Sequence, residues 1–343
     1  MIQNVGPMVF IYTDINQAYE QMQMVKGEFT DWEETRNGRA MAFQYPVLLH
    51  SPTPQRRVLF CPIRNANPFF HYMEAIWMLS GSENVDFPSY FAKNIKDYSD
   101  DGVTLHGAYG YRWKHHFEVD QIESVIYELA TNPTSRRMVV AMWDPQVDLE
   151  KESKDIPCNT HLYFRVVQGA LSMTVLNRSN DMVWGMLGAN YVHFSILQEY
   201  MAEAAHLEIG AMYQFTNNLH VYQGWEDKFG PMSDWYRANP VIRRWLFGPE
   251  NLNLEEAAHF VEHWSEYEDH IAPKCRILRD NAFPMLMAWD NHKDGNYDLA
   301  LHYAAKIWDD DWRHACENWL KRQMIRKSGV TTTKLVGKNT GTE

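Results

Sequence analysis

The chain has 343 residues, 45% of them hydrophobic and 14% aromatic, and its formal net charge is −12. This length suits one large domain or two ordinary ones, and the abundance of large apolar residues excludes disorder over most of the chain. An acidic protein gains nothing from the phosphates of a polynucleotide, so non-specific nucleic-acid binding is excluded. A few arginines can still bind the single phosphate of a small ligand.

The four cysteines are too few for a disulfide scaffold in a chain this long, and their spacing matches no metal site. The N-terminus lacks the apolar stretch of a secretory signal, and no apolar run approaches the roughly 18 residues that cross a membrane. We therefore expect a protein of the cytoplasm, or of a host cytoplasm if the gene is viral. We expect it to bind neither a metal nor a membrane.

Hydrophobic periodicity and turn residues predict an irregular succession of elements. In chain order these are an amphipathic segment at 15–25, a loop at 35–39, a strand at 40–49, a helix at 68–79, a helix at 121–130, a buried strand at 138–143, a strand pair at 160–167 and 171–176, a helix at 190–207, a further strand within 209–222 and a helical segment at 298–324. Because strands and helices do not alternate regularly, a doubly wound nucleotide fold is not indicated. We predict an α+β fold with a mainly antiparallel or mixed sheet.

Cys158 lies between a proline-fixed turn and the strand predicted from residue 160. A lone cysteine is usually an inert thiol, but a rigid and partly exposed cysteine at a strand edge can be a nucleophile. Arginines near it would lower the pKa of the thiol and increase its thiolate fraction. The same side chains could bind a phosphate through paired hydrogen bonds. The residues that could do so are Arg136, Arg137, Arg178 and Ser179.

Further polar residues occupy positions where a ligand could be recognised. His220 and Tyr222, two residues apart on a predicted strand, project to the same side of it. They are either a solvated pair or ligands of a sugar hydroxyl. Asp181 and Asn190 flank a glycine-containing turn that leads into a long helix. Glu74 lies inside an aromatic-rich helix, where a solvated face and a functional carboxylate are equally good interpretations.

Together these residues resemble the thymidylate synthase family over roughly residues 30 to 225. The resemblance depends on several motifs that occur in the family's order and approximate spacing, of which no single one would be specific. The motifs are Thr35-Arg36-Asn37-Gly38, the helix from Glu74 to Gly81, Gly107-Ala108-Tyr109-Gly110, Ser135-Arg136-Arg137, Pro157-Cys158-Asn159, Asn177-Arg178-Ser179-Asn180-Asp181 and Leu219-His220-Val221-Tyr222.

The resemblance implies a homodimer whose mixed, twisted sheets, flanked by helices, pack back to back. It also implies a reaction between a pyrimidine nucleoside monophosphate and 5,10-methylenetetrahydrofolate. Cys158 would add to C6 of the pyrimidine, which makes C5 a nucleophile toward the methylene carbon of the folate. Glu74 would organise water and proton transfers around the base, and Tyr109 would help to remove the C5 proton.

The resemblance also assigns binding roles to other residues. Phosphate ligands would be Arg36, Arg178 and Ser179, joined by Arg136 and Arg137 from the partner subunit. Asp181 would hold the pterin ring of the folate. His220 and Tyr222 would bind the 3′ hydroxyl of the ribose.

Departures from the family pattern point to its hydroxymethylase branch. Asn159 follows the nucleophile where thymidylate synthases usually have histidine. The tryptophans expected between residues 94 and 102 to wall the folate are missing, and Lys96 and Tyr98 stand nearby. A helical extension replaces the apolar tail that closes a synthase active site. Because closure excludes water from reactive intermediates, a more open site would let water capture the exocyclic methylene.

The residue that reads the base is expected to be Asn190, if one residue is inserted between residues 186 and 189. An asparagine amide can accept from uracil N3–H and donate to O4. The flipped amide could instead recognise cytosine, because its two ends are complementary. Asn190 therefore favours dUMP slightly over dCMP or CMP.

The first hypothesis is C5 hydroxymethylation of a pyrimidine nucleoside monophosphate. The alternatives are a C5 methyltransferase of the same family and a catalytically silent nucleotide-binding paralogue. The presence of Cys158, Glu74 and Asp181 argues against the silent paralogue. We expect a catalytic domain at residues 1–240, a helical extension packed on it at 241–326, and a flexible tail at 327–343.

Overall fold

The computed structural model describes residues 7–22, 24–25, 29–238, 246–247, 254–268 and 272–327. Within them the strands form a larger sheet, in the order β1-β4-β9-β7-β6-β5, and a smaller sheet, in the order β2-β3-β10-β8. Neighbouring strands are parallel at β1–β4 and β7–β9 and antiparallel at the other junctions of the larger sheet. The predicted α+β fold with a mixed sheet is confirmed, and residues 328–343, most of the predicted tail, lie outside the described residues.

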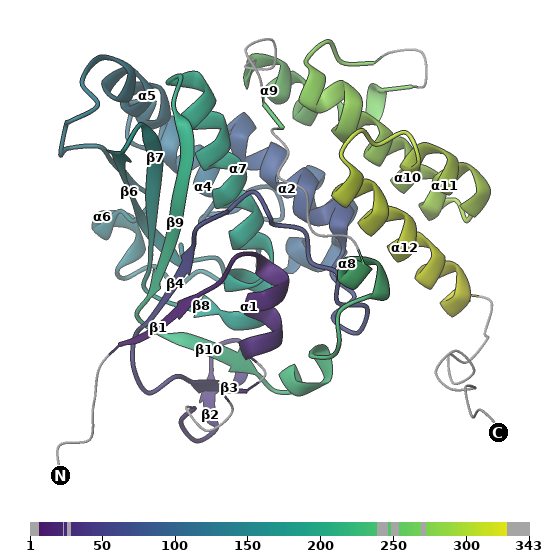
Figure 1. Cartoon of the computed structure of the whole chain (residues 1–343), viewed down its shortest axis with the longest axis horizontal. Helices are drawn as coiled ribbons and strands as arrows, with labels where there is room; N and C mark the ends of the chain where they lie inside the picture. Colours follow the sequence, from purple (N-terminus) through teal and green to yellow (C-terminus); the bar gives the residue numbers. More distant parts are fainter. Residues whose placement is uncertain are drawn as a thin grey trace.

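The elements are those labelled in Figure 1. The strands are β1 (Met8–Ile11), β2 (Glu33–Thr35), β3 (Gly38–Ala42), β4 (Val47–Ser51), β5 (Val139–Ala141), β6 (Asn159–Val167), β7 (Ala170–Asn177), β8 (Asn180–Asp181), β9 (Glu208–Thr216) and β10 (Leu219–Tyr222). The helices are α1 (Ile15–Met22), α2 (Pro68–Ser80), α3 (Asp86–Phe91), α4 (Tyr109–Tyr111), α5 (Gln121–Thr131), α6 (Pro145–Asp148), α7 (Ala189–Ala204), α8 (Asp234–Ala238), α9 (Leu254–Glu262), α10 (Phe283–Lys293), α11 (Tyr297–Ala304) and α12 (Asp310–Lys327). None of these helices combines the length and apolar character that a membrane crossing needs.

Some predicted elements divide in the structure. The strand predicted at 40–49 becomes β3 and β4, which belong to different sheets, and Pro46 between them lacks the N–H that a central strand needs. The helical segment predicted at 298–324 divides into α11 and α12. Asp309 starts the second helix by accepting hydrogen bonds from the backbone N–H groups of Asp311 and Trp312, at 2.9 and 3.0 Å.

Two predictions in the sheets also need correction. The strand predicted within 209–222 is two strands, β9 and β10, separated by Asn217 and Asn218. The buried strand predicted at 138–143 is the edge strand β5, with Val140 buried and Val139 41% exposed. The hairpin between β6 and β7 is as expected, because Gln168 and Gly169 both have positive φ angles, which suits a tight turn.

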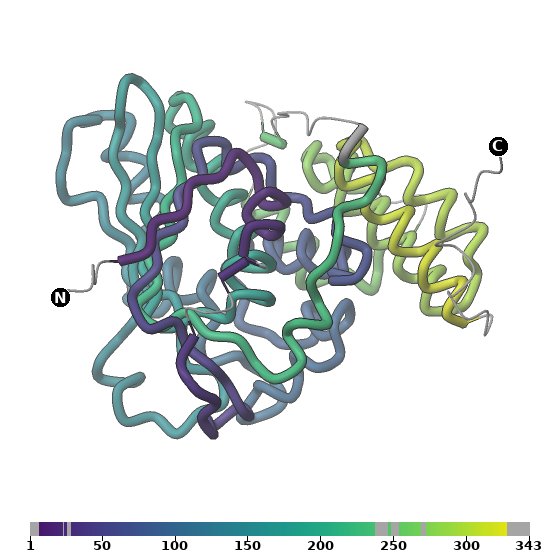
Figure 2. Tube along the Cα trace, turned by 60° about the horizontal axis from the view of Figure 1, so that its bottom comes forward, coloured from purple at the N-terminus to yellow at the C-terminus, as the bar shows by residue number. Residues whose placement is uncertain are grey.

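Helix α2 is the central helix of the fold. It begins where Asn67 accepts from the N–H of Phe70 and ends at Gly81, whose positive φ of 81° favours glycine. Every residue of α2 except Glu74 is buried, as expected for a helix that is apolar on all sides. Helix α7 packs on one side of it and α9, α10 and α12 on others (Figure 1). Figure 2 confirms that the C-terminal helices lie at the end of the molecule away from β6 and β7.

A buried ion pair joins α7 to the segment that precedes α2. The guanidinium of Arg57 and the carboxylate of Glu199 are in contact, and their side chains are 2% and 0% exposed. Glu199 also accepts from the backbone N–H of Leu246. The pair satisfies both charges, but removal of one partner leaves a charge buried without compensation.

Replacing one partner of this pair should therefore be costly. We expect Arg57→Met to lower the free energy of unfolding by about 3–5 kcal/mol, measured by urea denaturation. The Arg57→Met/Glu199→Met double variant should lose less than either single variant, because no uncompensated charge remains. Glu317→Gln, at the more exposed pair with Lys321, is the control and should cost about 0.5 kcal/mol or less. Additive losses in the double variant would contradict the buried-charge explanation.

Candidate active site

A cavity of about 870 Å³ opens between the smaller sheet, α2 and the ends of β6 and β7. The pairing of β10 with β8 sets His220 beside Asp181, and the pairing of β6 with β7 brings Asn159 opposite Asn177. These registers bring together residues that are far apart in the sequence. The predicted site residues that line the cavity are Arg36, Glu74, Cys158, Arg178, Ser179, Asp181, His220 and Tyr222.

Cys158 lies immediately before β6 and is held by Arg178. The backbone N–H of Arg178 donates to the carbonyl of Cys158 at 3.0 Å. The guanidinium of Arg178 donates to the carbonyls of Pro157 and Ile156, at 2.9 and 3.0 Å, and its Nη2 lies 3.9 Å from Sγ of Cys158. Arg178 therefore fixes the loop that presents the thiol.

The charge of Arg178 does not decide the acidity of this thiol. Burial raises the pKa of Cys158 above its ordinary value, although the guanidinium of Arg178 opposes the effect. Arg136 and Arg137 are exposed and lie before β5, outside the cavity lining, and Arg137 pairs with Glu128 at 3.3 Å. Arg178 and Arg36 thus lower the pKa of Cys158, as expected of neighbouring arginines, but in the single chain burial outweighs them.

Tyr109 contacts the backbone at Cys158 and at the residue after it. Its hydroxyl accepts from the N–H groups of Cys158 and Asn159, at 3.3 and 3.4 Å. Burial raises the pKa of Tyr109 far above its ordinary value, so the phenol stays protonated. Tyr109 is outside the cavity lining, and with both backbone donors on its oxygen it retains a proton that it can donate.

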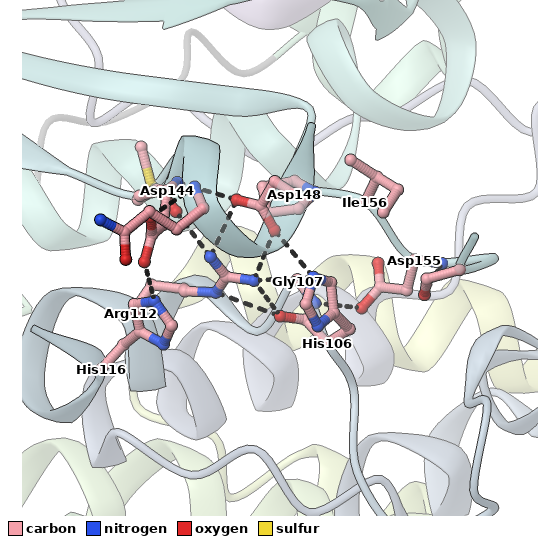
Figure 3. Close-up of polar contacts among 12 residues, drawn as sticks. His106, Gly107, Arg112, His116, Asp144, Asp148, Asp155 and Ile156 are labelled. Carbon is pink, nitrogen blue, oxygen red and sulfur yellow. Dashed lines mark hydrogen bonds and ion pairs between the residues drawn. The ribbon is translucent and has the colours of Figure 1, made fainter. Parts of the chain in front are cut away.

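A polar network holds the Tyr109 segment against the Cys158 segment (Figure 3). Arg112 donates to both carboxylate oxygens of Asp148 at 2.9 Å, and His106 lies 2.7 Å from the same carboxylate. The N–H of Gly107 donates to Asp155 at 2.8 Å. Because Arg112 and Asp148 are buried, these contacts hold residues 106–112 firmly against residues 148–155, which precede Cys158.

Glu74 and His193 form a contact that sequence reasoning missed. Nε2 of His193 lies 2.8 Å from Oε2 of Glu74, and the two side chains are 2% and 14% exposed. Glu74 is on α2 and His193 on α7, so the packing of the two helices makes the contact. One signal in the sequence could have found His193. It follows Asn190 by three residues, so the two lie on the same face of the helix, and Asn190 was expected to face the ligand.

On the opposite wall, His220 and Tyr222 contact each other, as their spacing on one strand implies, with ring centroids 5.1 Å apart. Nδ1 of His220 lies 3.3 Å from the hydroxyl of Ser179. Arg36, in the turn between β2 and β3 of the same sheet, donates to the carbonyls of Ser153 and Lys154. This wall therefore presents a hydroxyl, an imidazole, a phenol and two guanidinium groups, a set that can bind a phosphorylated sugar.

Residues 64–274 match the model of the thymidylate synthase family. The chain belongs to the thymidylate synthase family. A protein named deoxyuridylate hydroxymethyltransferase, from Pseudomonas phage M6, is 37% identical over 84% of this chain and 87% of its own length. Proteins of the same name from Bacillus phage SP01 and Delftia phage PhiW-14 are 38% and 30% identical, over 52% and 66% of this chain and 49% and 64% of their own lengths. The chain is accordingly a one-carbon transferase.

Asp181, which the family resemblance assigns to the pterin, also has a structural contact. Its carboxylate accepts from the N–H groups of Val183 and Trp184, both at 2.7 Å, and so caps the π-helical turn Met182–Met186. Burial raises the pKa of Asp181. Trp184, which sequence reasoning missed, lines the cavity with 53% of its surface exposed and lies over the guanidinium of Arg64 at 4.2 Å. This tryptophan gives the cavity the indole that residues 94–102 lack, next to the phenol of Tyr98, which also lines it.

Asn159 and Asn190, at positions that departed from the family pattern, are not among the described residues that line the cavity. Asn159 is fully buried, and neither end of its amide has a hydrogen-bond partner in the part of the chain that the structure describes. Nδ2 of Asn190 donates to Oδ1 of Asn180 at 3.1 Å. Among the described residues, no group of His, Cys, Asp and Glu side chains has the arrangement of a metal site.

The raised pKa of Cys158 leads to a testable pH dependence. Because the thiolate is the nucleophile, alkylation of Cys158 by iodoacetamide should accelerate with rising pH, with its midpoint above the ordinary thiol pKa. Arg178→Met should move that midpoint to still higher pH, since it removes the charge that favours the thiolate. Peptide mass spectrometry separates Cys158 from the buried Cys61, Cys275 and Cys316. Labelling that is fastest near neutral pH and unaffected by Arg178→Met would contradict this assignment.

Proposed function

We propose that this chain catalyses the hydroxymethylation of dUMP at C5, with 5,10-methylenetetrahydrofolate and water as the other substrates. The observation that carries the proposal is one cavity that joins the Cys158 nucleophile, the Glu74 carboxylate and a phosphate-binding wall. The names of the three phage relatives support the same reaction. The folate supplies a carbon at the oxidation level of formaldehyde.

Nucleotide binding uses the wall opposite α2. The phosphate binds Arg36, Arg178 and Ser179, and the 3′ hydroxyl of the ribose binds His220 and Tyr222. Support for this arrangement comes from the guanidinium and hydroxyl groups on one wall and from the 3.3 Å contact between Ser179 and His220. The ribose then points toward the smaller sheet, and the base points toward Cys158 and Glu74.

Catalysis begins when the Cys158 thiolate adds to C6 of the base and electrons move onto O4. C5 thereby becomes nucleophilic and bonds to the one-carbon unit. Tyr109, held protonated beside the nucleophile, orients the water that takes the C5 proton. Asp181 and Trp184 fit the pterin side of the cavity, since one offers a carboxylate and the other an exposed aromatic face.

Hydroxymethylation is favoured over methylation by the position of the C-terminal helices. Helices α10 and α12 pack against α2, and among the described residues none from α10, α11 or α12 lines the cavity. These three helices therefore do not take the place of the closing tail of a synthase. An open cavity leaves water able to reach the exocyclic methylene.

For base selection we assign Asn190 and favour dUMP. Its Nδ2 is engaged with Asn180, which leaves Oδ1 to accept from uracil N3–H. Asn180 itself has a buried Nδ2 without a hydrogen-bond partner among the described residues. A flip of both amides would direct Nδ2 of Asn190 toward the base, where it could donate to cytosine N3. For this reason dCMP and CMP are the alternative substrates to test.

A homodimer that shares its active sites accounts for the outer face of the larger sheet. Paired strands align two rows of side chains there, and these rows include exposed apolar and aromatic residues. One row is Val9, Leu48, Phe215, Leu176, His161 and Ala141, and the other is Ile11, His50, Tyr213, Thr174, Tyr163 and Val139. Val9, Ile11 and Tyr163 are 54%, 62% and 43% exposed, which suits a covered interface. Arg136 and Arg137, beside β5, would then reach the partner's phosphate site.

The phage relatives support a role in supplying a modified nucleotide for phage DNA. The reaction would take place in the cytoplasm of the infected host.

Tritium release and product mass test the proposed reaction. With methylenetetrahydrofolate, the enzyme should release tritium from C5-labelled dUMP faster than from dCMP or CMP, and the product should be heavier than dUMP by a CH₂O unit. Cys158→Ala should abolish release but still bind dUMP. A product heavier by CH₂ with formation of dihydrofolate would identify a methyltransferase. No release from any of the three nucleotides would identify a silent paralogue.

Subunit complementation tests the shared active site. Cys158→Ala and the Arg136→Ala/Arg137→Ala double variant should each be nearly inactive. Mixed dimers should contain one site with an intact Cys158 and the partner's intact arginines. An equal mixture, after subunit exchange, should regain about one quarter of the wild-type activity, because half of the dimers carry one good site of two. Failure to recover activity although mixed dimers form would contradict the shared site.

A further inference from the structure

The Glu74–His193 contact contains buried polar atoms without proper hydrogen bonds. His193 is 3% exposed, and both of its ring nitrogens are buried and unpaired by hydrogen-bond geometry within the described chain. Nε2 nevertheless lies 2.8 Å from Oε2 of Glu74. The contact is therefore close but bent. Buried polar groups in a native protein are nearly always satisfied, so this contact calls for a functional explanation.

We propose that His193 is a positioning residue that orients the Glu74 carboxylate for the addition of water to the exocyclic methylene. The proposal rests on the proposed hydroxymethylation. A tilt of the imidazole would let Nε2–H donate to Oε2 and hold the carboxylate in one orientation. The other oxygen then faces the cavity that Glu74 lines.

The surroundings make this orientation specific. Glu74 is the one residue of α2 that is not buried, and its Oε2 is itself buried. Only Oε1 is then left to face the reactants. Because α2 and α7 pack directly against each other, the distance between the two side chains is set by rigid helices. Without His193, the carboxylate can rotate about its own axis and either oxygen can turn away.

The step that His193 would support is the addition of water to the exocyclic methylene, followed by release of Cys158. After the folate leaves, the base carries an exocyclic C5=CH₂ and remains bonded to Cys158 at C6. The oxygen of water bonds to the CH₂ carbon, and the pair of electrons of C5=CH₂ moves into the ring and onto O4. The proton of the water passes to Oε1 of Glu74. The O4 carbonyl then re-forms, C5=C6 forms, and the C6–S bond breaks to release the Cys158 thiolate.

His71 provides a matched control on the same helix. It is buried and lies one turn before Glu74. Burial, with Arg64 and His193 nearby, lowers the pKa of His71 to about 3, so it is neutral at working pH. His71 lines a different cavity, beside α12, and not the one that holds Cys158. His71→Phe therefore replaces a buried histidine of α2 without removing a contact of the Glu74 carboxylate.

The experiment measures how the methylene intermediate partitions. The enzyme is incubated with C5-tritiated dUMP, methylenetetrahydrofolate and excess 2-mercaptoethanol, which competes with water for the electrophilic CH₂. Tritium release reports the steps up to this intermediate, and mass spectrometry gives the ratio of hydroxymethyl product to thioether. His193→Phe should lower this ratio about tenfold, because a mis-oriented general base loses part of its contribution. His193→Gln, which keeps an N–H donor, should stay within about threefold of wild type, and His71→Phe should match wild type.

The outcomes separate the two proposals. Normal tritium release with an unchanged product ratio in His193→Phe would overturn the role of His193 and leave the reaction intact. Equal losses of tritium release and product in His193→Phe and His71→Phe would also overturn it. The loss would then come from replacing any buried histidine and not from the contact with Glu74. If His193→Phe does not fold, the comparison of His193→Gln with Glu74→Gln decides, and a wild-type ratio in both refutes the proposal. No tritium release by the wild type would instead overturn the proposed function.

Discussion

The site depends on a constraint at α2, a helix that is buried on every side except at one carboxylate. Burial of such a helix requires neighbours all round, and the N-terminal and C-terminal parts of the chain both supply them. Phe69 lies against Trp289 of α10 and Trp319 of α12, with ring centroids 5.5 and 5.7 Å apart. The extension therefore completes the core around α2 and, through it, fixes Glu74. Rigid helices hold a functional group more firmly than loops do.

The arginines of the cavity already have hydrogen-bond partners within the chain. Arg178 donates to the backbone carbonyls of the loop before Cys158, and Arg36 donates to the carbonyls of Ser153 and Lys154. A bound phosphate must share or displace these contacts, and its negative charge weakens the help that Arg178 gives to the thiolate. The thiol already has a raised pKa in the single chain. Further positive charge from a partner subunit would offset both effects, so a shared site suits the electrostatics.

Local signals in the sequence were sufficient for elements with clear ends. Proline and glycine bound α2, Gln168-Gly169 makes the β6–β7 turn, and the sites of Cys158, Arg178 and His220 fell in one cavity as their motifs implied. Element boundaries that depend on a single residue were harder to predict. Pro46 divides a run that looks like one strand, and Asp309 divides a run that looks like one helix.

Contacts between distant elements could not be predicted from the sequence. The pairs Arg57–Glu199 and Glu74–His193 join residues separated by more than a hundred positions. Nothing local marks either partner, because each pair exists only once α7 packs beside α2 and the segment before it. The balance between burial and charge at Cys158 is likewise a property of the packed site. The spacing of the motifs predicted arginines near the thiol, but it carried no information on how deeply the sulfur is buried.

The turn between Asp181 and Asn190 is wider than an α-helical turn. The N–H of Leu187 donates to the carbonyl of Met182, five residues back, so the turn contains one residue more than an α-helical turn would. The turn lies directly before α7, the helix that carries Asn190 in its first turn. The close packing needs glycine, because a Cβ on Gly185 would lie 2.0 Å from Oδ1 of Asn180, and one on Gly188 would lie 2.4 Å from the carbonyl of Trp184. The same two glycines thus allow Asn180 to meet Asn190 and leave Trp184 at the cavity wall.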